Sequence, residues 1–175
     1  MLKNYKMKTM LFTSPSKGIK TLYLFVLLTF ITTLGVSAQN CSATLEVEHG
    51  FSTRSAFAKG AKFSLVLTNT SSSEMTFDLE AISSDAKCGD ARMEKTGKNV
   101  KVNTELLTSN AKSSLGNSIT LSAGETFSFV VKAMPPTGTA YNKWSCVNVK
   151  ATPRSCKTAS IETTLKVFIP NPTQH

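Results

Sequence analysis

The sequence contains very little histidine, which removes the side chain most often used in acid–base catalysis. Of its 175 residues only His49 and His175 are histidines, and His175 is the last residue. Hydrolysis by serine, cysteine or metal centres usually needs a positioned imidazole or an equivalent base. The cysteines form no close pair of the Cys-x-x-Cys kind, and no Asp-x-Asp-x-Asp calcium loop occurs. We therefore predict a protein that is not an enzyme and holds neither a metal nor a cofactor.

Carboxylates are present, but not where acid–base chemistry is expected. Glu46 with Glu48, and Asp78 with Glu80, fall on the polar side of alternating segments. General acid–base work would need burial to shift their pKa values, and the alternation places them in solvent. These pairs are interpreted as solvated strand faces.

Acidic residues are absent from the first 38 positions, which carry five lysines: Lys3, Lys6, Lys8, Lys17 and Lys20. The apolar run that follows spans roughly 13 residues from Leu22 to Leu34, whereas a membrane-spanning helix needs about 20. It ends in Val36-Ser37-Ala38, the small-residue pattern of a signal-peptidase site. We predict a cleaved signal peptide over 1–38, the alternative being a retained anchor. One domain, 39–175, would remain in the periplasm or outside the cell.

The cysteine count indicates two disulfides in that domain. Cys41, Cys88, Cys146 and Cys156 form an even set, as expected of an exported chain. Three connectivities are possible. A Cys146–Cys156 bridge, leaving Cys41 with Cys88, is favoured because ten residues suit a strand and the turn after it.

Apolar and polar residues alternate at short intervals, and helical spacing is scarce. A period of two indicates strands with one buried and one solvated face. We expect seven to eight strands in a single antiparallel sandwich, with irregular segments at 83–97 and 109–116 and room for a short helix at 104–112. The segments with the strand pattern are 43–47, 63–67, 77–81, 100–102, 119–121, 127–133, 147–151 and 161–169.

Two strand–turn–strand segments resemble bacterial immunoglobulin-like (Ig-like) or fibronectin-III-like modules. Residues 63–79 read FSLVLTNTSSSEMTFDL, and residues 119–131 read ITLSAGETFSFVV. Pro135-Pro136-Thr137-Gly138 before a further strand fits the same modules, so the resemblance covers about 62–169. It implies an Ig-like β-sandwich and says little about function, because this fold hosts many activities. Asn69-Thr70-Ser71 matches the glycosylation sequon, for which turn chemistry is a sufficient explanation.

Positive charge gathers in the last third of the chain. Residues 126–175 carry six basic residues and a single acidic one, Glu162. A basic, aromatic hairpin there could hold an acidic glycan, a lipid head group or an acidic protein patch, whereas nucleic acid is a poor partner for an exported chain. The alternative is a solvated edge, since lysines protect edge strands. The candidate contact residues are Lys143, Trp144, Lys150, Arg154 and Lys157.

Trp144 itself has two interpretations, a core residue beside a disulfide or a platform for stacking sugars. It lies in phase with Cys146 and out of phase with Val147 and Val149. This phase places it on the outer face of its strand, and the sequence does not decide between the two.

The leading interpretation is an exported, non-catalytic Ig-like binding or structural module that contacts an anionic component of the cell envelope. The alternative is a periplasmic assembly factor, a chaperone-like sandwich that offers a strand edge to a client. Pilus chaperones usually comprise two such domains, and this chain has room for one. An enzyme is the third interpretation.

Overall fold

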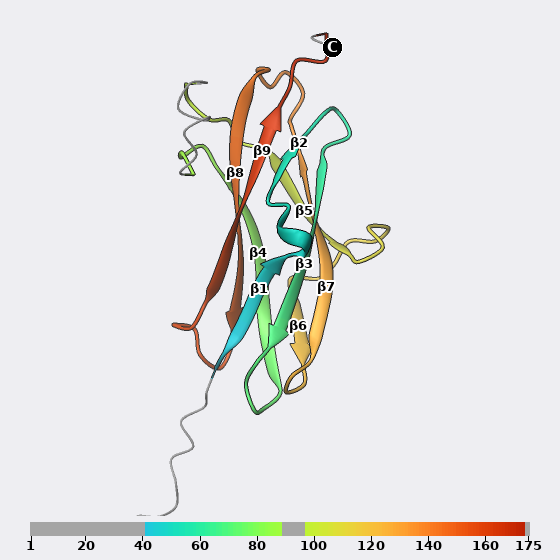
Figure 1. The fold of residues 1–175 in the computed structure, drawn as a ribbon. Coiled ribbons are helices and arrows are strands. Elements are labelled where there is room, and N and C mark those ends of the chain that lie inside the picture. The colour runs from blue at the N-terminus through green and yellow to red at the C-terminus, as the bar shows by residue number, and fades with distance from the viewer. Residues whose placement is uncertain (1–40, 89–96, 174–175) are drawn as a thin grey trace, which may run out of the picture. The chain divides into compact units, whose positions relative to one another are not determined.

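The computed structural model describes residues 41–88 and 97–173 (Figure 1). The chain divides into two units, residues 1–39 and 40–175, and all described residues belong to the second. The predicted signal peptide and its cleavage site therefore lie outside the described residues. Within 41–88 and 97–173, no helix has the length and apolar character needed to cross a membrane.

Nine strands in the described part of the chain form two sheets (Figure 1). The four-stranded sheet has the order β1 (Ala43–Val47), β3 (Ala61–Asn69), β7 (Thr126–Met134), β5 (Asn103–Thr108). The five-stranded sheet has the order β2 (Thr53–Ser55), β9 (Ile161–Ile169), β8 (Lys143–Pro153), β4 (Met75–Ser84), β6 (Ser118–Leu121). Every neighbouring pair is antiparallel except β2 and β9, which run parallel. The arrangement confirms the all-β, Ig-like β-sandwich.

The core lies between the two sheets, as the alternation predicts. Phe63, Leu65 and Leu67 of β3 are fully buried, and the residues between them are more exposed. Phe77 of β4 and Phe129 of β7 meet them from the two sheets within one cluster. Burial of each such side chain stabilises the fold by roughly 1.5–3 kcal/mol.

The chain changes sheets between β1 and β2. The turn that redirects it, η1 (Glu48–Gly50), places His49 and Gly50 in the left-handed region with φ of 57° and 70°. β2 then pairs with β9. The sequence did not predict β2, because its three residues are all exposed and show no apolar alternation.

Two local predictions are wrong. In place of a helix at 104–112 the chain forms β5, which pairs with β7 along its whole length. The strand expected at 100–102 is absent, because these residues form an irregular segment leading into β5. Pairing with β7 buries Leu107, and this tertiary contact outweighs the weak helical spacing.

The number of disulfides is confirmed, but the favoured pairing is wrong. Cys41 bonds to Cys156, and Cys88 bonds to Cys146. β8 is extended from Lys143 to Pro153, so about 23 Å of strand separates Cys146 from the end of β8 at Pro153. A disulfide needs Cα atoms within about 7 Å, which a continuous strand of this length does not allow.

Candidate binding site at one end of the sandwich

The four basic residues of the predicted binding hairpin do not lie together. Lys143 begins β8, and Arg154 follows its last residue, so roughly 36 Å of strand separates them. Arg154 and Lys157 share one end of the sandwich, in the connection from β8 to β9. Lys150 lies between the two ends.

Arg154 is held by Asp78, which projects from β4. Its Nε and Nη2 both approach Asp78 Oδ1, at 2.8 and 2.7 Å. The hydrogen bond from Arg154 is the main cause that lowers the pKa of Asp78; desolvation opposes it, and the charges of Arg154 and Lys157 lower the pKa further. The same carboxylate raises the pKa of Arg154. The charge of the guanidinium is therefore already balanced by Asp78 within the fold.

Lys150 is also placed beside carboxylates. Its neighbours across the sheet are Glu80 on β4 and Glu162 on β9, and its Nζ lies 3.6 Å from Glu162 Oε1. A surface pair of this kind is worth at most about 1 kcal/mol. The two carboxylates nonetheless balance the charge of Lys150. An anionic partner for this hairpin stays a prediction.

Trp144 is a packing residue. It lies on the outer face of its sheet, as its phase indicates, but only 8% of its surface is exposed. Its ring centroid is 4.9 Å from that of Phe168 on β9, and it shares a second, small core with Cys88 and Cys146. The segment that carries Cys88 is tied across this face by the disulfide. Burial of this extent favours the core interpretation of Trp144 over the sugar platform.

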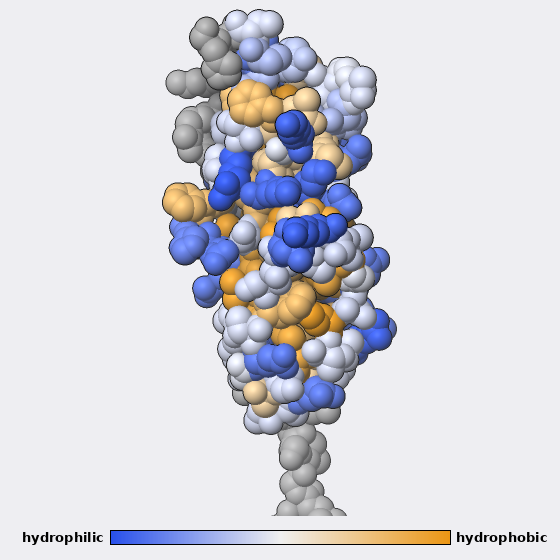
Figure 2. Space-filling view, turned by 90° about the vertical axis from the view of Figure 1, so that its right-hand side faces the viewer, coloured by the Kyte–Doolittle hydropathy of each residue, from blue (hydrophilic) through white to orange (hydrophobic). Residues whose placement is uncertain are grey.

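The outer face of the four-stranded sheet carries mixed charge. Lys62, Lys132 and Glu105 lie side by side across β3, β7 and β5. Figure 2 shows hydrophilic residues gathered across the middle of the side that lies to the right in Figure 1. Charges of both signs in one row indicate a solvated face.

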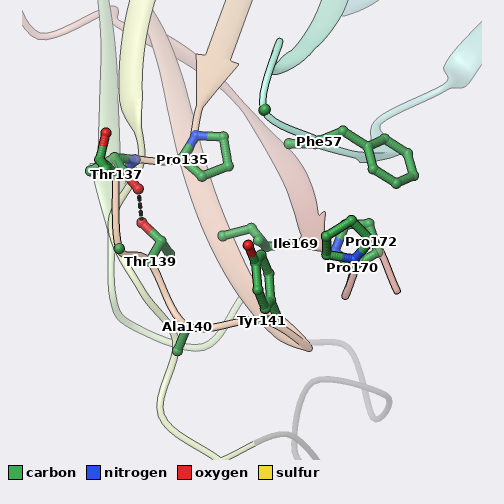
Figure 3. A pocket seen from close by; sticks show the side chains of 13 residues that line it. Phe57, Pro135, Thr137, Thr139, Ala140, Tyr141, Ile169, Pro170 and Pro172 are labelled. Carbon is green, nitrogen blue, oxygen red and sulfur yellow. Dashed lines mark hydrogen bonds between the residues drawn. The ribbon is translucent and has the colours of Figure 1, made fainter. Parts of the chain in front are cut away.

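The described residues form an open pocket of about 660 Å³ at the other end of the sandwich from Arg154 (Figure 3). Three segments that are distant in sequence build it: the β2–β3 connection, the β7–β8 connection and the chain after β9. Its volume falls in the usual range for ligand pockets, about 300–1,000 Å³. The lining residues are Ala56, Phe57, Ala58, Pro135, Pro136, Thr137, Gly138, Thr139, Ala140, Tyr141, Ile169, Pro170 and Pro172.

Local chemistry fixes the walls of this pocket. Pro135 and Pro136 end β7 because they have no N–H to continue the ladder. The Thr139 hydroxyl then donates to the Pro136 carbonyl at 2.6 Å, the bond dashed in Figure 3. In the β2–β3 connection, which supplies another wall, Gly60 has φ of +79°, and a Cβ at this position would come within 2.6 Å of the Ala133 carbonyl oxygen. Glycine is therefore required where the β2–β3 turn meets the end of β7.

The pocket is apolar and uncharged. None of the described residues that line it is acidic or basic. Phe57 and Tyr141 remain 45% and 55% exposed, which is high for aromatic rings beside a concave surface. Such a surface accepts apolar groups and offers an ionic ligand no counter-charge.

Sequence reasoning missed this site. Pro135 and Pro136 entered the sequence analysis only through the resemblance to Ig-like modules, and neither Phe57 nor Tyr141 was singled out. No spacing pattern connects residues 56–58, 135–141 and 169–172, because only the fold brings them together. The available signal was the pair of loop aromatics, Phe57 and Tyr141, each lying beside a strand end without belonging to an alternating run.

The chain matches no protein-family model and no curated protein. Among solved structures it is similar to the periplasmic chaperone SfaE, with 14% identity and a TM-score of 0.43 over 74% of this chain and 58% of the other. A family 123 glycoside hydrolase from Clostridium perfringens aligns with 11% identity and a TM-score of 0.48 over 74% and 28%. The PapD-like domain 7 of human CEP192 aligns with 8% identity and a TM-score of 0.41 over 94% and 99%.

The chain spans little more than half the length of the chaperone and under a third of the hydrolase. At such identities these likenesses concern the fold alone. The Ig-like assignment rests on the two sheets and their order, and the function has to be argued from the pocket.

Proposed function

We propose that this protein is an exported, non-catalytic Ig-like binding module, and that its ligand enters the pocket at the end of the sandwich. Two disulfides support an oxidising destination, the periplasm or the extracellular space. N-terminal sequencing of the exported protein is expected to begin at Gln39. A product that keeps residues 1–20 would contradict the signal-peptide prediction.

The observation that carries the proposal is the uncharged pocket with its two half-exposed rings. An aromatic side chain can bury 150–250 Å², so covering the exposed halves of Phe57 and Tyr141 removes roughly 200 Å² from water. At about 25 cal/mol per Å² this contributes about 5 kcal/mol before the entropic costs of association. The expected ligand group is apolar and uncharged. An anionic envelope component would have to bind elsewhere.

A second candidate function is assembly of a client through a strand edge. The observation that favours it is β2, an edge strand whose three residues are all exposed. The β5 edge is less accessible, because Ser113 and Leu115 form backbone hydrogen bonds with Thr108 and Leu106. The open edge of β2 adjoins the pocket along the chain.

The pocket is tested with an uncharged, environment-sensitive dye, Nile red. Its binding is compared among variants in which one aromatic residue is replaced by alanine. Phe57→Ala and Tyr141→Ala are each expected to weaken dye binding about tenfold, the equivalent of about 1.4 kcal/mol. Phe51→Ala is the control, because Phe51 is 61% exposed and lies outside the pocket. Equal dye binding by all three variants and the unaltered protein would refute the proposal.

A further inference from the structure

The edge of β2 presents a set of backbone groups that faces away from the sheet. The Lys166 amide donates to the Ser52 carbonyl, and the Ala56 amide donates to the Phe168 carbonyl. Successive residues of a strand point their N–H and C=O groups to opposite sides. Because Ser52 and Ala56 bond to β9, the backbone groups of Thr53 and Ser55 face outward. Within the described residues, no strand pairs with this side of β2.

Part of another edge, that of β4 beyond its pairing with β6, is covered by the chain itself. Beyond Leu79, where β6 pairing ends, the Thr104 hydroxyl donates to the Ala81 carbonyl at 2.6 Å. The Val102 amide donates to the Ser83 hydroxyl close by. The first contact satisfies the Ala81 carbonyl, a backbone group on which an added strand would have to pair. β2 differs from this stretch of β4 in being exposed along its whole length.

The open edge leads directly into the pocket. Ala56 follows β2 at once, and Ala56, Phe57 and Ala58 form one pocket wall. A residue paired with Ser55 would lie about 5 Å from it, the spacing of strands in a sheet. Phe57 is only two residues further along the chain. The next residues of an added strand would therefore reach the pocket.

We propose that the partner is an extended polypeptide segment that pairs with β2 and places an apolar side chain between Phe57 and Tyr141. This inference rests on the proposed function and names the ligand class of the same site. Thr53 and Ser55 each offer one donor and one acceptor, a set that a second extended backbone matches. The pocket supplies the selectivity, since it accepts an apolar and uncharged side chain. This is the division of labour in strand addition, where backbone bonds give affinity and pockets give specificity.

The test begins with a phage-displayed library of random peptides selected on the oxidised protein. Selected peptides are then synthesised with N-methyl groups on alternate residues, in the two possible phases. One phase is expected to lose binding tenfold or more, because it removes the N–H groups that face β2. The other phase is expected to bind as the unmodified peptide does.

Variants of the protein complete the test. Ser55→Pro removes an outward N–H and leaves the bonds from β2 to β9 in place, and Tyr141→Ala opens the pocket. Each is expected to weaken peptide binding about tenfold. Thr120→Pro is the matched control, because the Leu79–Asn117 bond places the backbone of Thr120 on the open side of β6. Should Ser55→Pro fail to fold, the two N-methyl series still decide the question.

The outcomes separate the two proposals. If Tyr141→Ala weakens binding while both N-methyl series bind normally, the pocket stands and the strand pairing is refuted. If one N-methyl series fails to bind while Tyr141→Ala has no effect, the edge of β2 binds the peptide without the pocket. The inference that one partner uses both the edge and the pocket is then refuted. If no peptide is selected, and Nile red binds the Phe57→Ala and Tyr141→Ala variants as well as it binds the unaltered protein, both proposals are refuted.

Discussion

Asn69 holds the end of the sandwich opposite the pocket, and its replacement gives a sharp test of the fold. The residue is fully buried at the end of β3. Its Nδ2 donates to the carbonyls of Ser73, Leu121 and Ser122 at 2.8, 3.0 and 3.0 Å. Its Oδ1 accepts from the amide and the hydroxyl of Ser71. One side chain thus ties the β3–β4 turn to the β6–β7 turn.

The expected cost follows from these bonds. Two N–H groups and one acceptor are lost in Asn69→Ala, and each is worth about 1 kcal/mol net, so the free energy of unfolding should fall by about 3 kcal/mol. Asn69→Asp keeps the shape but points a carboxylate oxygen at three carbonyl oxygens. A buried charge with one oxygen facing only acceptors should cost more than the alanine change at neutral pH, although Ser71 can still donate to the other oxygen.

The carboxylate variant also has a defined pH dependence. Burial beside carbonyls raises the folded-state pKa of the introduced carboxyl above its unfolded value. Its protonated form can donate a hydrogen bond, so the variant should keep more stability below the unfolded pKa and lose it as pH rises through the folded pKa. Asn69→Ala should show no such difference from the unaltered protein.

Urea unfolding followed by Trp144 fluorescence and far-ultraviolet circular dichroism measures both effects. Asn117→Asp is the control, because Asn117 is exposed and no hydrogen bond of its side chain occurs among the described residues. Its loss should be below about 0.5 kcal/mol, as for most surface changes. A loss for Asn69→Ala as small as that of the control would refute the assignment of Asn69 as the residue that joins the two turns.

Three further expectations follow from single contacts. Replacing Cys41 and Cys156 together by serine should lower the free energy of unfolding by about 5 kcal/mol, against about 4 kcal/mol for Cys88 and Cys146. The first bridge closes the longer loop, 115 residues against 58. A Cys146–Cys156 peptide in a non-reducing digest would contradict the pairing. Arg154→Ala should raise the pKa of Asp78 towards its ordinary value in an NMR titration. The contribution of this pair to stability is present above the unfolded-state pKa of Asp78 and is lost as pH falls through its folded-state pKa. A titration of Asp78 that Arg154→Ala leaves unchanged would count against the pair. Trp144→Ala should cost about 3–5 kcal/mol, and an unaltered melting temperature would restore the platform interpretation.

The sequence predicts most of the sandwich because its strands alternate. β3 buries every second residue along its whole length, and β9 does so from Leu165 to Ile169; this period is visible in the sequence. β2 has no buried residue, so its position depends on β9 and on the turn at His49 and Gly50. The disulfides were misassigned for a related reason. Spacing along the chain suggested a local bridge, but the extended β8 keeps Cys146 away from Cys156, and each bonds to a distant cysteine.

The candidate site was harder to predict than the fold, and the charge pattern shows why. Charge was counted along the chain, where Lys150 and Arg154 look unopposed. In the sheet, Lys150 lies beside Glu80 and Glu162, and Arg154 is held by Asp78. Cross-strand neighbours come from distant positions, so a local count cannot show that a charge is already balanced. The apolar pocket is hidden in the same way, because its three walls come from three separate loops.

The two ends of the sandwich differ in the contacts that hold their loops. At one end, Asn69 joins two turns, and the Cys41–Cys156 bridge fastens the start of β1 to the β8–β9 connection. At the other end, prolines and two half-exposed rings surround the pocket, and a side-chain hydrogen bond within its lining joins Thr139 to Pro136. Loops held by few hydrogen bonds open at low free-energy cost. The partner proposed for the pocket would therefore bind at the end that neither Asn69 nor the Cys41–Cys156 bridge holds together, while these contacts keep the strand register at the opposite end.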